Sequence, residues 1–316
     1  MKVLVTGSTG FVGSRVVELS EEREWEVLPV VRKASQIQPN SFVVPSIDST
    51  TDWSGAFDCV DCVVHCAARV HQMNETVQEA KEAYHEVNTL GTLNLARQAA
   101  TNGVTRFVFI SSIKVNGEQT EVGESFKPNL TNVPVDPYGL SKYEAEVGLR
   151  KIAEETGLEV VIIRPPLVYG PGVKANFSAM MFLVDKGVPL PLGAVHNQRS
   201  LVYLDNLVDL ILLCCRHDEA ANETFLVSDD FDVSTTQLLK SISSVLGKTP
   251  RLLPVPMTWL KLLSNLVMKP QISDKLCGNL QVNIIDTRVI LNWAPKVSFE
   301  DAIQRTVDAH LDSKVN

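Results

Sequence analysis

The sequence lacks both a long hydrophobic run and an excess of positive charge. Its longest apolar stretch, residues 207–215, contains Asp209 and is far shorter than the roughly 20 residues of a membrane-spanning helix. The chain has 29 Lys and Arg residues against 37 Asp and Glu residues, a net charge of −8. It therefore has no global attraction for nucleic acid or for an anionic membrane, and we expect neither as a partner. A phosphate ligand would have to be bound locally.

Cysteine is scarce, with 6 residues in a chain of 316, which is typical of the reducing cytoplasm, where we expect this protein to act. Cys59, Cys62 and Cys66 lie close together in the sequence, but no second Cys or His pair follows at zinc spacing. Buried thiols are the better interpretation, because Cys62 and Cys66 fall inside an apolar run, and no metal is predicted. The apolar start, residues 1–6, is too short for a signal peptide and has no cleavage site.

The composition is that of a globular protein, with 45% hydrophobic and 21% charged residues. In the first half, short apolar runs alternate with longer amphipathic stretches, of which residues 85–102 and 140–156 are the clearest. This alternation predicts an α/β fold with a doubly wound parallel sheet of the Rossmann type. The expected strands are residues 3–6, 26–32, 42–48, 62–68, 106–112 and 159–165, with a seventh at 224–228 after a helix around 205–217.

The organisation changes after Pro165, where prolines recur and no regular partner strands are apparent. Helical patterns at residues 178–186, 235–246, 257–268 and 299–311 predict a smaller, mainly helical, substrate-binding lobe. We expect the sheet domain to comprise residues 1–168 and about 202–230. The lobe would then comprise about 169–201 and 231–316.

Three glycines separate the first expected strand from the first helix. Gly7 permits a tight turn, Gly10 lets backbone approach a pyrophosphate, and Gly13 lets helix and strand pack closely. A glycine-rich turn without a ligand is the alternative. The position after a buried strand favours a dinucleotide site contacted by Gly7, Thr9, Gly10, Phe11, Val12 and Gly13.

Tyr138 and Lys142 lie one helical turn apart, so the ammonium can sit near the phenol. A phenol with its usual pKa near 10 is a poor acid–base catalyst at neutral pH, and an adjacent cation lowers that pKa. Asp136 and Pro137 are suited to begin this helix. A surface Tyr and Lys on an amphipathic helix is the alternative, since the spacing is common by chance.

Ser111 and Ser112 end the fifth expected strand, where parallel sheets place ligand chemistry. Together with the glycine spacing and the Tyr-x-x-x-Lys pair, they resemble the extended short-chain dehydrogenase/reductase (NAD-dependent epimerase/dehydratase) superfamily over nearly the whole chain. Counting back from Gly117, the resemblance implies that Ser112 is the catalytic hydroxyl and that Ser111 lies beside the nicotinamide. Ser112, Tyr138 and Lys142 would then be the catalytic residues, with Tyr138 and Lys142 also contacting the cofactor.

The same resemblance implies further cofactor contacts, one position at a time. Asn88 corresponds to a helix asparagine near the catalytic lysine, although a purely structural role remains open for it. The other positions are Asp48 near the adenine, Ala67 and Ala68 beside a ribose, and Pro165 and Val168 against the nicotinamide.

Cofactor choice is usually set where the second strand ends. An acidic residue there selects NAD, whereas an arginine accommodates the 2′-phosphate of NADP. This sequence has Arg32 and no Asp or Glu, so NADP(H) is favoured and NAD(H) remains an alternative.

Two residues align with diphosphate-binding positions of the superfamily, Asn176 and Arg199, and local pairing is the alternative for each. Residues 111–117, 165–177 and 190–194 resemble the bacterial 4-ketoreductases and nucleotide-sugar 4-epimerases that act on UDP-2-acetamido-2,6-dideoxy-hexoses. Sugar dehydration is disfavoured, because Ile113 and Lys114 follow Ser112 where the 4,6-dehydratases have Asp and Glu.

The residues alone predict reduction of a ketone, nucleotide-linked or other, at a hydroxyl-bearing carbon. The resemblance implies more specifically an NADP-dependent reductase of a nucleotide-linked 4-keto-6-deoxy sugar in surface-polysaccharide synthesis. One alternative is a UDP-sugar 4-epimerase that retains NAD. Reduction of an aromatic ketone or aldehyde fits Arg199 and Asn176 less well, and a non-enzymatic dinucleotide sensor does not explain why Tyr138 and Lys142 are both present. The sequence leaves a homodimer open.

Overall fold

The computed structural model describes residues 1–32, 40–70, 77–260 and 276–315. Its main element is a seven-stranded sheet in the order β3-β2-β1-β4-β5-β6-β9, with every neighbouring pair parallel. The strand order reverses between β1 and β4, which is where parallel sheets of this kind bind ligands. The strands are β1 (Lys2–Thr6), β2 (Glu26–Val31), β3 (Phe42–Val43), β4 (Cys62–His65), β5 (Arg106–Ile110), β6 (Glu159–Arg164) and β9 (Thr224–Leu226).

All seven predicted strands are present, although most are shorter than expected. The clearest case is β3, expected over residues 42–48 but only Phe42–Val43 in the structure. Val44 still donates its backbone N–H to the Val31 carbonyl, but Pro45 has no N–H to continue the ladder. A proline close to the end of an edge strand therefore limits its length.

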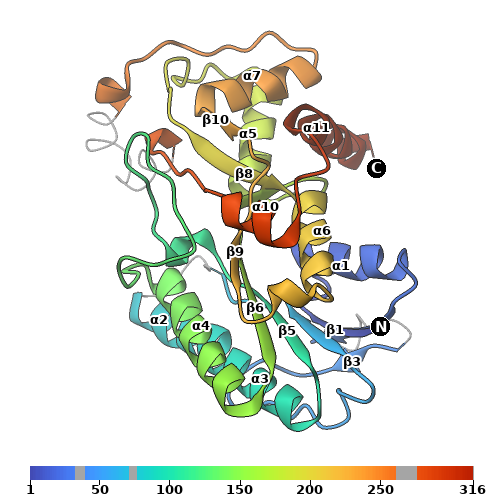
Figure 1. The fold of residues 1–316 in the computed structure, drawn as a ribbon. Helices are drawn as coiled ribbons and strands as arrows, with labels where there is room; N and C mark the ends of the chain where they lie inside the picture. The colour runs from blue at the N-terminus through green and yellow to red at the C-terminus, as the bar shows by residue number, and fades with distance from the viewer. Residues whose placement is uncertain (33–39, 71–76, 261–275, 316) are drawn as a thin grey trace.

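Helices cover both faces of the sheet (Figure 1). In β1, Val3 and Val5 enter the apolar cluster under α1 and α6, whereas Leu4 enters the cluster under α3 and α4. Because both faces are buried, the strands read as continuous apolar runs, as the sequence indicates. The flanking helices are α1 (Phe11–Glu21), α2 (Val77–Tyr84), α3 (Thr92–Thr101), α4 (Pro137–Thr156) and α6 (Leu204–Cys214).

Two helix boundaries follow directly from the sequence. Asp136 caps α4 by accepting the Gly139 N–H at 2.8 Å, with Pro137 in the first turn, as predicted. Gly157 ends the helix with a left-handed φ of 78°. The helix expected over residues 85–102 instead begins with a π-helical segment, η2 (His85–Gly91), and continues as α3.

A smaller lobe follows β6 and β9, so it lies beyond the carboxyl ends of the sheet (Figure 1). It is mainly helical, as predicted, but it also holds a three-stranded sheet in the order β10-β8-β7, which the sequence did not indicate. Residues 257–260 of the helix expected over 257–268 are helical, and the remainder lies outside the described residues. The lobe contains β7 (Leu167–Tyr169), α5 (Ala175–Asp185), β8 (Arg199–Tyr203), β10 (Asp232–Val233), α7 (Thr235–Val245) and α11 (Phe299–Val315). The helix α10 (Ile285–Leu291) packs instead against β9, where the Thr287 hydroxyl donates to the Leu226 carbonyl at 2.6 Å.

The expectation of buried thiols is confirmed for Cys62 and wrong for Cys59, which is exposed, while Cys66 is partly buried. Among the described residues, no three His, Cys, Asp or Glu side chains group as metal ligands. No helix in the described ranges has the length and hydropathy of a membrane-spanning segment.

Candidate active site

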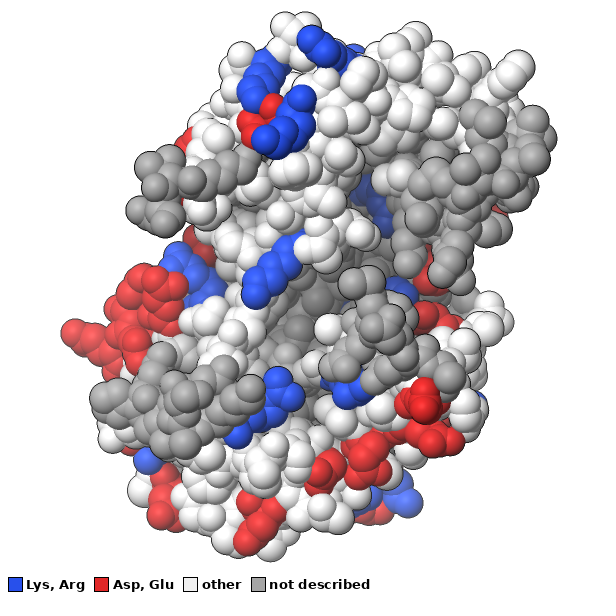
Figure 2. All heavy atoms as spheres, turned by 180° about the vertical axis from the view of Figure 1, so that it is seen from behind, with Lys and Arg blue, Asp and Glu red and all other residues white. Residues whose placement is uncertain are grey.

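Most of the residues predicted for cofactor binding and catalysis lie at the carboxyl edge of the main sheet and at the start of α4. Gly7, Ala67, Ser112 and Pro165 each follow a different parallel strand, β1, β4, β5 and β6, so the fold brings segments far apart in sequence to one edge. Seen from behind in Figure 2, the molecule is hollowed across its middle, with Lys and Arg side chains around the hollow.

The glycine loop is built so closely that side chains would not fit. Gly7 has a φ of +67°, and a Cβ on it would lie 2.8 Å from the backbone nitrogen of Ala67. A Cβ on Gly13 would lie 2.2 Å from the Gly7 carbonyl oxygen. The loop is closed by the Gly10 N–H, which donates to that same carbonyl at 2.8 Å. These contacts explain why glycine occupies positions 7 and 13, whereas a Cβ on Gly10 would lie 3.1 Å from the Gly7 carbonyl oxygen, a tight contact that a small shift could relieve.

The loop presents the beginning of α1. Gly10 is the N-cap residue and makes no side-chain capping bond, so the first backbone N–H groups of the helix are available to an anion. Thr9 and Gly10 are exposed, and Phe11 and Val12 are partly exposed. A cradle of this kind suits a pyrophosphate, and the cofactor contacts expected for the glycine loop stay a prediction.

The two serines after β5 are engaged in different ways. The Ser111 hydroxyl donates to Glu146 at 2.6 Å in a buried hydrogen bond, whereas the Ser112 hydroxyl accepts the Lys114 N–H at 3.3 Å and caps the 3-10 helix η3 (Ile113–Val115). Ser112 is half-buried, so its hydroxyl is the better placed of the two to meet a substrate. The cofactor contact of Ser111 stays a prediction, and its hydroxyl is already committed to Glu146.

Lys142 is buried on the inner face of α4. Its ammonium donates to the Ile110 carbonyl at 2.9 Å and lies 4.4 Å from the centroid of the Phe109 ring. Burial lowers the pKa of Lys142 to about 8, while Cys66 and Glu146 act in the opposite direction. The ammonium is thus held at the end of β5 by a backbone carbonyl and an aromatic face.

Tyr138 lies one turn earlier, with its ring edge-on to Tyr84 at 5.8 Å between centroids and 6.0 Å from the Lys114 ammonium. Burial raises the pKa of Tyr138 to about 12, with smaller contributions from Asp136 and Tyr84. The sequence-based expectation of a lowered phenol pKa is therefore wrong for this arrangement. The cause is that desolvation disfavours the phenolate, while Lys142 is directed at the Ile110 carbonyl.

Asn88 and Asp48 make mainly structural contacts. Asn88 is buried in η2, where its side-chain oxygen accepts the Arg69 N–H at 2.7 Å and its side-chain nitrogen donates to the Ser141 hydroxyl at 3.1 Å. Hydrogen bonds within its own turn, the strongest from Ser46, lower the pKa of Asp48 to about 2. The cofactor contacts of both residues stay predictions, as do those of Ala67, Ala68, Pro165 and Val168.

Arg32 is exposed directly after β2, where an arginine can meet a 2′-phosphate, and this role also stays a prediction. Arg199 opens β8 and is largely buried, with Nη1 donating to the Gly278 carbonyl at 3.1 Å. Burial lowers the pKa of Arg199. Asn176 is exposed in the first turn of α5. Diphosphate binding by Arg199 and Asn176 is likewise untested by these contacts.

Sequence reasoning missed three features around the site. His65 is fully buried at the end of β4, with its two ring nitrogens 2.6 Å from Thr6 Oγ1 and 2.9 Å from Thr92 Oγ1. The π-helical turn around Asn88 is a feature often found at functional sites. The third is the buried ion pair of Glu146 and Arg164. The only sequence signal for His65 is a histidine at the end of an apolar run.

Comparison with known proteins identifies relatives over the whole chain. Residues 3–228 match the profile of the NAD dependent epimerase/dehydratase family. The chain is 48% identical over 314 residues to UDP-glucose 4-epimerase of Vibrio cholerae, covering 98% of this chain and 96% of that protein. It is 27% identical over 248 residues to N-acetyl-alpha-D-glucosaminyl-diphospho-ditrans,octacis-undecaprenol 4-epimerase of Escherichia coli O157:H7, covering 78% and 72% of the two chains.

Solved structures give the same fold. UDP-glucose 4-epimerase of Thermotoga maritima with UDP-glucose has a TM-score of 0.76 and 25% identity, covering 99% of this chain and 100% of that one. UDP-glucose 4-epimerase of Thermus thermophilus with NAD also has a TM-score of 0.76, with 26% identity and 98% of both chains covered.

Proposed function

The chain belongs to the NAD dependent epimerase/dehydratase family, and on that premise we propose that it is a UDP-sugar 4-epimerase, which inverts the configuration at C4 of a UDP-hexose. The observation that carries the proposal is the 48% identity to a UDP-glucose 4-epimerase over nearly the full length of both chains. The epimerase was the alternative in the sequence analysis. It now has better support than the NADP-dependent reductase.

The residues around the glycine loop suit a dinucleotide. The cradle leaves no room for a side chain at Gly7 or Gly13, and the first turn of α1 offers N–H groups to a pyrophosphate. When bound, NAD would supply the hydride acceptor for C4 of the sugar and the hydride for the return step. We expect Lys142 and the backbone after β4 to hold the ribose nearest the reacting carbon.

Tyr138 is the proposed acid and base for the C4 oxygen. Forming a 4-ketone removes the proton of the C4 hydroxyl, and the return step gives a proton back to the same oxygen. With a pKa of about 12, Tyr138 rests as the phenol, which is the form that the return step needs. Turning the Lys142 ammonium from the Ile110 carbonyl toward the phenol would lower the phenol pKa, so that Tyr138 loses its proton to solvent and the phenolate then accepts the proton of the C4 hydroxyl.

Ser112 is proposed to donate a hydrogen bond to the C4 oxygen, which orients it toward Tyr138 and polarises the ketone. Its hydroxyl accepts the Lys114 N–H, so its own hydrogen remains available to an acceptor. Inversion requires that the 4-ketone present its opposite face before the hydride returns. Epimerisation consumes no cofactor, so a tightly retained NAD suits this reaction.

Arg32 favours a second candidate, the NADP-dependent 4-ketoreductase. It is exposed at the end of β2, where a guanidinium can pair with a 2′-phosphate. A reductase exchanges its cofactor at every turnover, so the two candidates differ in what the purified protein carries and consumes.

A cofactor-release and turnover experiment separates the two. The purified protein is denatured and the released dinucleotide identified, while native protein is mixed with UDP-glucose and no added cofactor. An epimerase yields NAD on denaturation and converts UDP-glucose to UDP-galactose. Protein that is inactive alone but consumes one NADPH for each molecule of a UDP-4-keto sugar reduced would establish the reductase instead. A Lys142→Met variant is the negative control for turnover, and we expect it to catalyse neither epimerisation nor NADPH-dependent reduction.

A further inference from the structure

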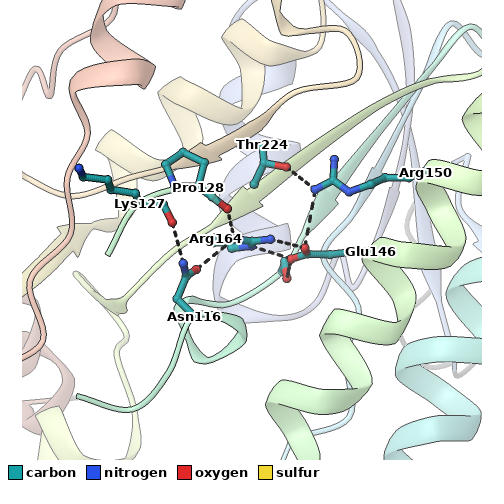
Figure 3. A network of polar contacts seen from close by, with 8 residues as sticks. Asn116, Lys127, Pro128, Glu146, Arg150, Arg164 and Thr224 are labelled. Carbon is teal, nitrogen blue, oxygen red and sulfur yellow. Dashed lines mark hydrogen bonds and ion pairs between the residues drawn. The ribbon is translucent and has the colours of Figure 1, made fainter. Parts of the chain in front are cut away.

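A buried ion pair lies between α4 and the end of β6 (Figure 3), and it contacts Ser111, the residue before Ser112. Glu146 and Arg164 are each 1% exposed. Nε and Nη2 of Arg164 donate to the two carboxylate oxygens of Glu146 at 2.9 and 2.5 Å, a two-point fork. Desolvation makes such a pair a poor source of stability compared with apolar side chains of the same size. Its position beside catalytic residues therefore suggests a role in the reaction.

Glu146 connects the catalytic helix to the catalytic strand. Its Oε1 accepts the Ser111 hydroxyl at 2.6 Å, and Ser111 immediately precedes Ser112. On α4, Glu146 lies one turn beyond Lys142 and two turns beyond Tyr138, so the three side chains share a helix face. The carboxylate thus fixes the place of α4 along the end of β5.

Arg164 connects the Glu146 carboxylate to the loop that follows Ser112. Its Nη1 donates to Asn116 Oδ1 at 3.1 Å and to the Pro128 carbonyl at 2.8 Å. The Asn116 side chain in turn donates to the Lys127 carbonyl at 2.7 Å. Figure 3 shows Glu146 of α4 and the two ends of the loop, Asn116 and Pro128, around the guanidinium of Arg164.

We propose that Glu146 and Arg164 are positioning residues that set the distance between Ser112 and Tyr138. Neither side chain needs to touch the substrate, because they act through Ser111, through α4 and through the loop of residues 116–128. The inference rests on the proposed function of the Ser112, Tyr138 and Lys142 site. A displacement of about 1 Å between reacting groups can cost on the order of a hundredfold in rate, so even a small relaxation of this network should be measurable.

A second ion pair, between β5 and β6, lies at the opposite end of β6 from Arg164 and provides the control. Arg106 opens β5 and Glu159 opens β6, with Nη2 and Oε2 2.5 Å apart. Arg106 also donates to the Cys214 and His217 carbonyls at the end of α6. Breaking this pair disturbs β5 and β6 at the amino edge of the sheet, away from Ser112.

The test replaces each pair by apolar residues of similar size, in the double variants E146L/R164M and R106M/E159L. For E146L/R164M we expect kcat for UDP-hexose epimerisation to fall by about 10- to 100-fold, with KM changed by less than about threefold. Its Tm should fall, because the Ser111 hydroxyl, Asn116 and the Pro128 carbonyl lose their partners, so kcat is measured at a temperature at which each variant is folded. The control R106M/E159L should keep kcat within about twofold, since it leaves the site geometry intact.

Chemical rescue supplies a second measurement if E146L/R164M does not fold. A pocket of about 320 Å³ lies beside the pair and is lined by Glu146, Arg150 and Arg164 among others. In Arg164→Ala, millimolar guanidinium ion can enter the vacated space and pair with Glu146. We expect it to restore part of kcat in this variant and none in Tyr138→Phe.

Three results would overturn the inference. A folded E146L/R164M variant with wild-type kcat would show that the pair does not position the catalytic residues. Guanidinium that raises the Tm of Arg164→Ala without raising kcat would do the same. If the wild type epimerises no UDP-sugar, the proposed function fails. Hydrogen exchange then tests separately whether the pair holds the loop of residues 116–128 in place. Backbone exchange in residues 116–128 should be faster in E146L/R164M than in R106M/E159L, and equal exchange in the two would contradict the inference.

Discussion

At the scale of single residues, burial sets the direction of the pKa shifts of Lys142 and Tyr138, the two titrating groups of the predicted catalytic set. It lowers the pKa of Lys142 to about 8 and raises that of Tyr138 to about 12. Both shifts favour the neutral form of the side chain. The sequence gives the identity and spacing of this pair, but it does not give the burial of either group. This is why the expected direction of the Tyr138 shift was wrong.

Tyr138→Phe removes only the hydroxyl that carries the proton. We expect kcat to fall by about 10²- to 10⁴-fold, the usual contribution of general acid–base catalysis, while cofactor affinity stays near that of the wild type. Steady-state kinetics and a dinucleotide titration measure the two quantities. Tyr143→Phe, on the same helix, is the matched control and should retain activity. If the Tyr138 variant kept more than about a tenth of the wild-type rate, another group would have to be the acid.

At the scale of elements, the sequence predicts those strands and helix ends that depend on residues close together in the chain. The seven strands of the main sheet follow from apolar runs buried on both faces, and the start of α4 follows from Asp136 and Pro137. The small sheet of β7, β8 and β10 could not be predicted, because its strands are short and pair between distant segments. In the same way, nothing in the sequence indicates that Glu146 and Arg164 form a buried pair, because only the fold brings the two side chains together.

Gly139→Ala tests how closely α4 must approach the segment after Ser112. Alanine normally stabilises a helix by about 1 kcal/mol relative to glycine. Here, however, a Cβ would lie 2.7 Å from the Lys114 carbonyl oxygen, so the first turn of α4 must move away from η3. We expect kcat to fall by roughly tenfold or more, because Tyr138 moves with that turn.

Gly148→Ala is the control on the same helix. Its Cβ would meet only side-chain carbons of Leu93, the nearest at 2.6 Å, and a flexible side chain can give way where a backbone carbonyl cannot. We therefore expect Gly148→Ala to keep the wild-type kcat. Equal activity in the two alanine variants would show that the contact between α4 and η3 does not control the site.

His65 joins β1, β4 and α3, and it should make the protein sensitive to acid. Burial, with a smaller contribution from Lys142, lowers the pKa of His65 to about 3, whereas an unfolded histidine titrates near 6.5. Between these values the unfolded state binds the extra proton, so the free energy of unfolding falls as the pH drops from about 6.5 toward 3. One proton contributes a slope of at most about 1.4 kcal/mol per pH unit.

Urea unfolding at about pH 7 and about pH 5 measures this dependence. His65→Gln should be less stable than the wild type at the higher pH but should lose less stability on acidification. Exposed His196 offers the control, and His196→Gln should keep the wild-type dependence. A His65→Gln protein with the same loss between the two pH values would rule out His65 as the source.

At the scale of the whole molecule, the sheet domain and the lobe are joined by backbone hydrogen bonds close to both halves of the proposed site. In the loop after Ser112, the Thr120 and Phe126 N–H groups donate to the Asn279 and Gln281 carbonyls at 3.0 and 2.8 Å. The segment they meet also pairs with β8, where the Ser200 N–H donates to the Leu280 carbonyl at 2.8 Å. A substrate that reaches from Tyr138 to Arg199 would therefore be held by both parts of the molecule.

Arg199→Ala tests whether the lobe binds the diphosphate of the substrate. Loss of a charge-assisted hydrogen bond costs about 1.5–3 kcal/mol, so we expect KM for a UDP-sugar to rise roughly ten- to a hundredfold. Because the diphosphate is remote from C4, the contact is equal in the ground and transition states, and kcat should change less. Arg199→Lys should recover only part of the loss, since an ammonium cannot form the planar fork. Lys248→Ala, which removes a cation of the same lobe paired with Asp185, should leave KM unchanged. Inhibition by UDP gives an independent measurement, and unchanged inhibition in Arg199→Ala would place the diphosphate elsewhere.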